Sequence, residues 1–407
     1  MINKMRILFR SIGPGFIIAS VVLGPGSIAV ASRIGSAHGY KLLWVIAIAA
    51  ICMATYTIMS ARFGVGNDKS ILQTITDTYG RWFSALIGIS AFLSAASFQF
   101  GNNLGIATGM HGLTGISETI WPLLFTTLAI VFIFWAKNVY KILEKMMMIM
   151  VLVMIIAFFI NLVFVKPNLI AILKGFLPVS FSVDQFDEMA AIVGTTFVLN
   201  ACIYHAYLVY DKGWKEDDLK IGMRDTLMGI TVLGIISTLI IVTSAAALHP
   251  KGIIVATAAD MSIQLEALFG NFSKYIFNVG LCAAAFSSLV INAVIGGGLL
   301  SDGFGFGRSM QDKMPKIFTT LILLIGMIIT VFFRGDIVYA LVLAQGSTLF
   351  AVPSIGIGLL LVANNKAIMR ELKNNRTQNI IAATGFILIL IMVVYMYHRL
   401  ITFLGNI

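Results

Sequence analysis

The stretch that decides the fold is residues 12–31, which read IGPGFIIASVVLGPGSIAVA. It is long enough to cross a bilayer, which requires about 20 helical residues. Its centre is the tetrapeptide Gly24-Pro25-Gly26-Ser27. Proline removes a backbone donor and glycine disfavours helix, so we expect the helix to break here. Broken spans are tolerated in lipid only where the freed backbone groups meet protein, water or a ligand, so the break predicts a solute site within the membrane.

The composition of the whole chain also places it in a membrane. Of its 407 residues 59% are apolar and 11% are charged, whereas soluble domains carry roughly 25% charged residues. The mean hydropathy is +0.95. The net charge of +10 does not indicate a nucleic-acid partner, because the basic residues are spread over short segments between apolar runs. The three cysteines, Cys52, Cys202 and Cys282, lie singly in apolar stretches and predict neither disulfides nor a zinc site.

About eleven apolar runs qualify as membrane spans, which predicts an all-helical protein embedded in lipid. A cytoplasmic N-terminus places 20 of the 28 lysines and arginines on the inner side. The positive-inside rule therefore favours a multi-pass plasma (inner) membrane protein with its N-terminus in the cytoplasm and its C-terminus outside. The longest hydrophilic stretch, 211–225, is predicted to be a cytoplasmic loop. The predicted spans are 12–34, 40–63, 82–110, 119–136, 142–165, 187–211, 225–248, 274–300, 317–335, 337–363 and 378–403.

The sixth predicted span is the expected companion of the first, because many transporters place their site between two discontinuous helices. It has no proline, but it contains Gly194 followed by two threonines. It also carries Asn200, Tyr204 and His205 where a lipid-facing helix would carry apolar side chains. These polar groups either line a substrate path or hydrogen-bond to neighbouring helices.

Five stretches, taken in order, resemble one family over nearly the whole chain. They are Gly13-Pro14-Gly15-Phe16, the Gly24–Ser27 break, Ser60-Ala61-Arg62, the run from Leu281 to Ser288, and Gln345 eight residues before Pro353. The family is the natural resistance-associated macrophage protein family of metal-ion transporters. The resemblance implies an all-α fold of the LeuT/APC type, with discontinuous first and sixth helices. It also implies a single transporter domain over 1–407, with inverted five-helix repeats at 1–170 and 171–365 and an eleventh span at 366–407.

The family's metal ligands are replaced in this chain. Its first-span motif is Asp-Pro-Gly-Asn, whose aspartate and asparagine bind a divalent cation, and Gly24 and Ser27 stand at those places. Its sixth-span motif is Met-Pro-His, matched here by Val198, Leu199 and Asn200. The resemblance therefore leaves the expected site without its carboxylate and without its soft sulfur ligand.

The polar residues of the implied proton pathway are replaced as well. The family carries an aspartate and a glutamate associated with proton movement in the third span, and Gln99 and Asn102 match them. Two polar residues of the family are retained, Gln345 in the tenth span and His205 in the sixth. We expect coupling to a proton or another cation, with Gln99, Asn102 and His205 as the possible pathway.

The loss of the carboxylate decides the expected substrate. A divalent cation entering a low-dielectric site must recover its lost hydration, which fixed negative charge chiefly supplies. The half-helix beginning near Gly26 instead presents backbone N–H groups, which favour an anion. We therefore expect a secondary transporter, not an enzyme, that moves a small organic acid or amino-acid-like solute by alternating access and needs no cofactor. The predicted substrate-binding residues are Gly24, Gly26, Ser27, Val198, Asn200 and Gln345.

Other interpretations remain open. One is the family's own activity, transport of divalent manganese, iron or magnesium, with Ser27, Asn200, Cys202 and Gln345 as ligands. Another is a channel or sensor that keeps the scaffold without coupled transport. Cys202 is better explained as a small packing residue than as a ligand, whereas His205 is equally well explained as a packing residue or a proton carrier. The methionines between 146 and 154 are interpreted as packing residues too, because consecutive positions spread around a helix.

Overall fold

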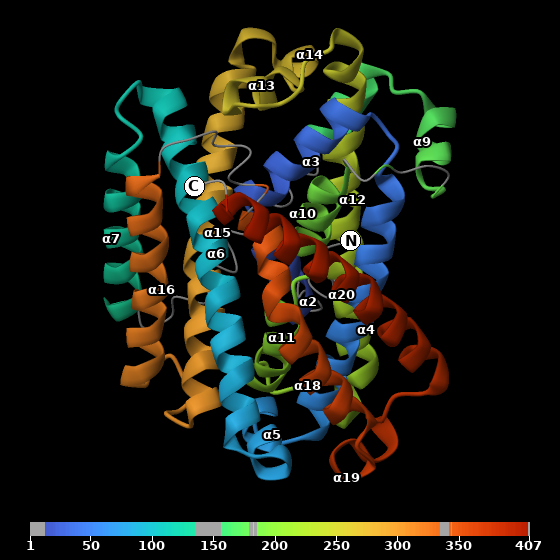
Figure 1. The fold of residues 1–407 in the computed structure, drawn as a ribbon, viewed down its shortest axis with the longest axis vertical. Helices are drawn as coiled ribbons and strands as arrows, with labels where there is room; N and C mark the ends of the chain where they lie inside the picture. The colour runs from blue at the N-terminus through green and yellow to red at the C-terminus, as the bar shows by residue number, and fades with distance from the viewer. Residues whose placement is uncertain are drawn as a thin grey trace, which may run out of the picture.

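The computed structural model describes residues 13–135, 156–178, 182, 185–333, 342 and 344–405. Within these ranges the chain is a bundle of α-helices with short 3-10 segments and no strand (Figure 1). This confirms the all-helical fold class. The start of the fifth predicted span, the start of the tenth and the methionines from 146 to 154 lie outside the described residues.

The first half of the chain opens with the broken span. Both of its helices begin with proline, which suits the first helical position because the missing N–H would have no partner there. Its segments are α2 (Pro14–Val22), α3 (Pro25–His38), α4 (Leu43–Gly66), α5 (Ile71–Tyr79), α6 (Arg81–Thr114), α7 (Ile120–Trp135), the helix Ile156–Val165 and α9 (Leu169–Gly175).

The second half contains the other broken span. Its α-helices are α10 (Phe186–Thr196), α11 (Leu199–Asp211), α12 (Leu219–Ala247), α13 (Ala258–Ile263), α14 (Glu266–Phe269), α15 (Ser273–Phe304), α16 (Lys313–Phe332), α18 (Val352–Asn364), α19 (Lys366–Met369) and α20 (Arg376–Gly405). Its 3-10 segments are η2 (Glu216–Asp218), η3 (His249–Lys251), η4 (Gly270–Phe272), η5 (Thr348–Ala351) and η6 (Arg370–Leu372).

The helices account for the predicted spans. Among the described residues, eight helical segments, one of them the broken α10–α11 pair, are long and apolar enough to cross a membrane, by length and composition. The α2–α3 pair and two shorter apolar helices, Ile120–Trp135 and Ile156–Val165, match the others. The stretch 211–225 is mostly helical instead of the predicted loop, because α11 reaches Asp211 and α12 begins at Leu219. The two repeats at 1–170 and 171–365 remain a prediction.

The two broken spans lie in the middle of the bundle. On one side α15 packs along α6, and α16 covers both helices. On the other side α12 packs against α2, α3 and α4, while α11 packs against α4. In Figure 1 the helices α13 and α14 lie at one end of the molecule, and α5 and α19 lie at the opposite end. We call these the α13 end and the α5 end. The scaffold therefore holds both interruptions away from lipid.

Candidate functional site

The break in the first span lies where the sequence predicts it. Leu23 and Gly24 separate α2 from α3, and Gly24 N–H donates to Val22 O at 2.9 Å. The last carbonyls of a helix have no partner within it. Here the Ser27 hydroxyl donates to Val22 O, and the Ser288 hydroxyl of α15 donates to Val21 O at 3.1 Å. Hydroxyl groups on both sides thus stabilise the interruption within the membrane.

The sixth span breaks without proline. Phe197 (φ −103°, ψ 73°) and Val198 (φ −90°, ψ 92°) separate α10 from α11, and neither residue is helical. The Phe197 ring packs on the Tyr56 ring of α4, with 5.2 Å between the centroids. All residues from Gly194 to Asn200 are buried. The predicted discontinuity of this span is confirmed, and it falls at Val198, one of the predicted site residues.

Gln345 joins the two broken spans. Its side chain lies against α3, since a β-carbon at Gly26 would overlap Gln345 Nε2. Its backbone lies against α10, since a β-carbon at Gly194 would overlap Gln345 O. Thr348, in the 3-10 segment that follows, donates to Gln345 O at 2.7 Å and to Gly194 O at 3.3 Å. Gly26, Gly194 and Gln345 therefore form one contact at the centre of the bundle.

The amides of the third span reach the first break. A β-carbon at Gly24 would lie 3.2 Å from Asn102 Oδ1 and 2.9 Å from Ser288 Oγ. Asn102 Nδ2 donates to Gln99 Oε1 at 3.2 Å, and Gln99 Nε2 donates to Leu289 O at 2.6 Å. The structure thus brings Gln99 and Asn102 together beside Gly24. Both are neutral, so the connection from α6 to the break consists of dipoles only.

Cys202 and His205 make contacts with the surrounding helices. Cys202 Sγ lies 3.1 Å from Met53 Sδ and accepts from Thr57 Oγ1 at 3.3 Å, both on α4. His205 Nε2 lies 2.9 Å from Thr226 Oγ1 on α12. These are the contacts of residues that pack one helix on another. Neither contact reaches toward Gln345 or the first break.

Two buried carboxylates, Asp225 and Asp302, and the half-buried Glu188 lie at other places. Asp225 of α12 accepts from Gly13 N at 2.8 Å and from Gly15 N at 2.7 Å, at the start of α2. Asp302 accepts from the Tyr207 hydroxyl, and Glu188 pairs with Arg33 at 3.4 Å. The part of the chain that the structure describes contains no group of three or more His, Cys, Asp or Glu residues that could hold a metal ion. Sequence reasoning did not single out Asp225. The sequence shows it only as an acidic residue at the start of the apolar run 225–248, which does not reveal its contact with Gly13 and Gly15.

Several buried polar atoms near the breaks have no hydrogen-bond partner in the described structure. They are Gln345 Oε1, Asn292 Oδ1 and Asn200 Nδ2. Buried polar atoms in folded proteins nearly always have partners, so an unpartnered group indicates a place for one. The Asn200 Oδ1 atom already accepts from Ala201 N at 3.1 Å, so the oxygens without a partner are those of Gln345 and Asn292. The centre of the bundle therefore offers uncharged oxygen atoms that lack a partner.

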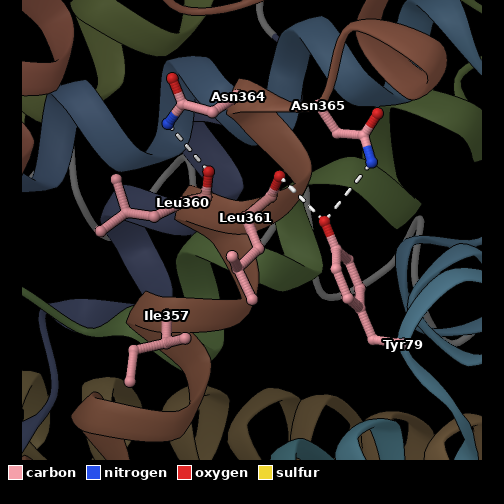
Figure 2. Close-up of a pocket in the computed structure, with 6 residues that line it drawn as sticks. All are labelled: Tyr79, Ile357, Leu360, Leu361, Asn364 and Asn365. Carbon is pink, nitrogen blue, oxygen red and sulfur yellow. Dashed lines mark hydrogen bonds between the residues drawn. The ribbon is translucent and has the colours of Figure 1, made fainter.

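A groove near the α5 end holds none of the predicted site residues. It lies between α5 and α18, measures about 390 Å³ and is lined by Tyr79, Ile357, Leu360, Leu361, Asn364 and Asn365 (Figure 2). The Tyr79 hydroxyl donates to Leu361 O and accepts from Asn365 Nδ2, both at 3.4 Å. Because its polar groups are already paired with each other, the breaks remain the candidate site.

Comparison with known sequences agrees with this geometry. The sequence profile of the family described as "Natural resistance-associated macrophage protein-like" matches residues 15–399. The chain belongs to this family. A "Divalent metal cation transporter MntH" of Caldanaerobacter subterraneus subsp. tengcongensis is 24% identical over 396 residues, covering 95% of this chain and 93% of the relative. A protein of the same name from Klebsiella pneumoniae is 24% identical over 392 residues, with the same coverage.

Solved structures share the fold at low sequence identity. A manganese transporter of Eremococcus coleocola, crystallised with an aromatic bis-isothiourea compound, matches with a TM-score of 0.83 at 16% identity. The match covers 99% of this chain and 89% of that one. Mhp1, a transporter of the nucleobase-cation-symport-1 family, matches with a TM-score of 0.59 at 15% identity, covering 95% of this chain and 92% of that one. The predicted LeuT-type fold is confirmed.

Family membership determines the broad class of this chain. It is a multi-pass integral membrane transporter and not an enzyme. This confirms the resemblance noted in the sequence and the class of activity expected from it. The side of the membrane on which each terminus lies remains a prediction.

Proposed function

We propose that this transporter carries a divalent metal cation, and that the cation binds where Gln345 meets the two broken spans. The observation that carries the proposal is the buried oxygen Gln345 Oε1, which has no hydrogen-bond partner in the described structure. The amide that carries this oxygen lies against Gly26 at the centre of the fold, with Nε2 as the nearest of its atoms to that position. An oxygen acceptor without a donor is a ligand for a cation.

The names of the relatives support the same substrate class. Both MntH relatives are named divalent metal cation transporters, and both align with 95% of this chain. The expected organic acid or amino-acid-like solute finds no such support among them. Its carboxylate would also need the space beside Gly26, which the Gln345 side chain occupies. The metal alternative from the sequence therefore replaces the organic anion as our proposal.

The ligand set favours a hard cation. Ser27, Asn200 and Gln345 offer oxygen atoms, whereas Cys202 is directed toward Met53. Oxygen ligands suit magnesium and manganese, and sulfur ligands suit softer metals. Because Gly24 supplies no charge, we expect the ion to keep several water molecules and to bind weakly. We expect coupling to a proton or another cation, through a path that includes Gln99 and Asn102.

A gain of charge at the first break tests this proposal. The double variant Gly24→Asp/Ser27→Asn places a carboxylate beside Ser288 and Asn102, where a β-carbon has little room. If the parent already binds the ion, calorimetric titration with Mn²⁺ should show weak binding by the parent and tighter binding by the variant. Gly280→Ala is the matched control, because a β-carbon there meets nothing within 4 Å. Binding by the double variant together with none by the parent would overturn the proposal.

A further inference from the structure

An apolar cavity lies between α4, α10 and α20, three helices that pack against one another (Figure 1). Its volume is about 220 Å³. The lining consists of aliphatic, aromatic and sulfur-bearing side chains together with Gly385. Phe197, which belongs to the break in the sixth span, forms part of the wall. The cavity therefore lies directly behind the broken helix α10.

The cavity has a buried floor and an exposed mouth. At the floor, Ala49 is 2% exposed and Phe197 is 1% exposed. At the mouth, Ile48, Leu388 and Ile391 are 36%, 38% and 53% exposed. The mouth residues belong to α4 and α20, both of which are long and apolar enough to span a membrane. The opening therefore faces the hydrocarbon of the bilayer, where lipid chains are the surrounding medium.

The lining selects the chemical class of the occupant. A polar ligand would lose its hydrogen bonds to water without replacing them in this cavity. An empty cavity would forfeit the close contacts that protein interiors otherwise make. We propose that the cavity binds the end of a phospholipid acyl chain, which enters between Ile48 and Ile391. Because this binding does not depend on the transported solute, it stands apart from the proposed function.

Because of where the cavity lies, an acyl chain bound in it would pack against the broken sixth span. An acyl chain in it would contact Met189, Val193 and Phe197, which lie on α10 and at its end. The opposite wall is α20, which is attached to α10 by the Phe186 and Tyr395 rings, with 5.1 Å between the centroids. The acyl chain thus completes the packing of α10, the first half of the broken sixth span.

Tryptophan quenching by brominated lipid tests the proposal. Trp44 lines the cavity, and the other four tryptophans (Trp82, Trp121, Trp135 and Trp214) are replaced by phenylalanine. The chain is placed in phosphatidylcholine vesicles containing a phospholipid brominated on its acyl chain. We expect a saturable quenching component in the parent and its loss in Ala49→Leu, which fills the floor. Ala50→Leu is the matched control, because Ala50 lines a different groove between α4 and α12.

Equal quenching of the parent and both variants would show only general lipid contact and would overturn the proposal. A second readout uses the native thiols and remains informative if Ala49→Leu folds poorly. Cys52 lines the cavity, whereas Cys202 is fully buried against Met53. A long-chain alkyl methanethiosulfonate should modify Cys52 well before Cys202, as measured by mass spectrometry.

Equal rates at the two cysteines would contradict the proposal. The other possible occupant of the cavity mouth is a second copy of the protein, which would give a different result from an acyl chain. Ile391→Cys would then form disulfide-linked dimers within the membrane, and the quenching of Trp44 would be lost. That outcome would assign the mouth to a protein interface and overturn acyl-chain binding.

Discussion

The side chain of Gln345 lies directly on the backbone of Gly26, and no side chain at position 26 fits between them. This contact joins the tenth span to the second half of the first. The substitution Gly26→Ala should displace the Gln345 amide and lower the rate of substrate uptake about tenfold, which corresponds to about 1.4 kcal/mol. Uptake into liposomes measures the effect. Gly280→Ala, where a β-carbon meets nothing, should transport like the parent, and equal uptake by both variants would contradict the role of the contact.

The buried Arg62 guanidinium should stabilise the α5 end. It donates to Leu372 O at 3.0 Å, to Gln378 Oε1 at 3.1 Å and to Asn374 Oδ1. Arg62→Met removes these hydrogen bonds and leaves buried acceptors unpaired, so we expect a loss of about 2–3 kcal/mol of stability. Thermal unfolding in detergent measures it. The exposed Arg376→Lys should change stability by less than about 0.5 kcal/mol, and a similar small effect for Arg62→Met would refute the prediction.

His205 should act as a packing residue. Its Nε2 atom pairs with Thr226, and the amide of glutamine can take the same position. We therefore expect His205→Gln to keep the parent's dependence of uptake rate on pH, whereas His205→Leu should lower the thermal stability. Histidine is the side chain that ordinarily changes charge near neutral pH. If His205→Gln removes the pH dependence while uptake continues, His205 carries the coupling proton instead.

The hydrogen bond from Tyr207 to Asp302 should keep the α5 end closed. The space beside it, lined by Phe63, Ser70, Ala206 and Tyr207 among others, is only about 10 Å³. Tyr207→Phe leaves the buried carboxylate short of a donor and should admit water. The measurement is labelling of Ala206→Cys by a hydrophilic thiol reagent, after replacement of the three native cysteines. We expect faster labelling when Tyr207→Phe is added, and an unchanged rate would show that the closure does not depend on this bond.

The first break could be predicted from the sequence, because it depends on the residues that stand at the break itself. The details of the site could not, because they depend on contacts between residues far apart in the chain. Gly24-Pro25-Gly26 signals an interruption by itself, because proline and glycine act on the backbone where they stand. The break at Phe197 and Val198 contains neither proline nor glycine, and Phe197 packs there against Tyr56 of α4, a contact that the sequence does not reveal. The resemblance supplied Gln345 as a site residue. Its contact with Gly194 could not be read from the sequence, because it joins residues 151 positions apart.

The substrate shows where sequence reasoning was weakest. The replacement of the aspartate by Gly24 favours an anion when the helix terminus is considered alone. In the folded chain the Gln345 amide lies against that terminus, and its Oε1 atom has no hydrogen-bond partner among the described residues. The electrostatic argument from one helix omitted a side chain that arrives from the tenth span.

The most direct test of the proposed function is uptake of Mn²⁺ and Mg²⁺ by liposomes that contain the purified parent chain, beside liposomes that contain Gly26→Ala. We predict saturable accumulation of at least one of the two ions with the parent and a strongly reduced rate with the variant. If the parent moves neither ion while the Gly24→Asp/Ser27→Asn chain does, the native site does not carry divalent cations, and the proposed function is wrong.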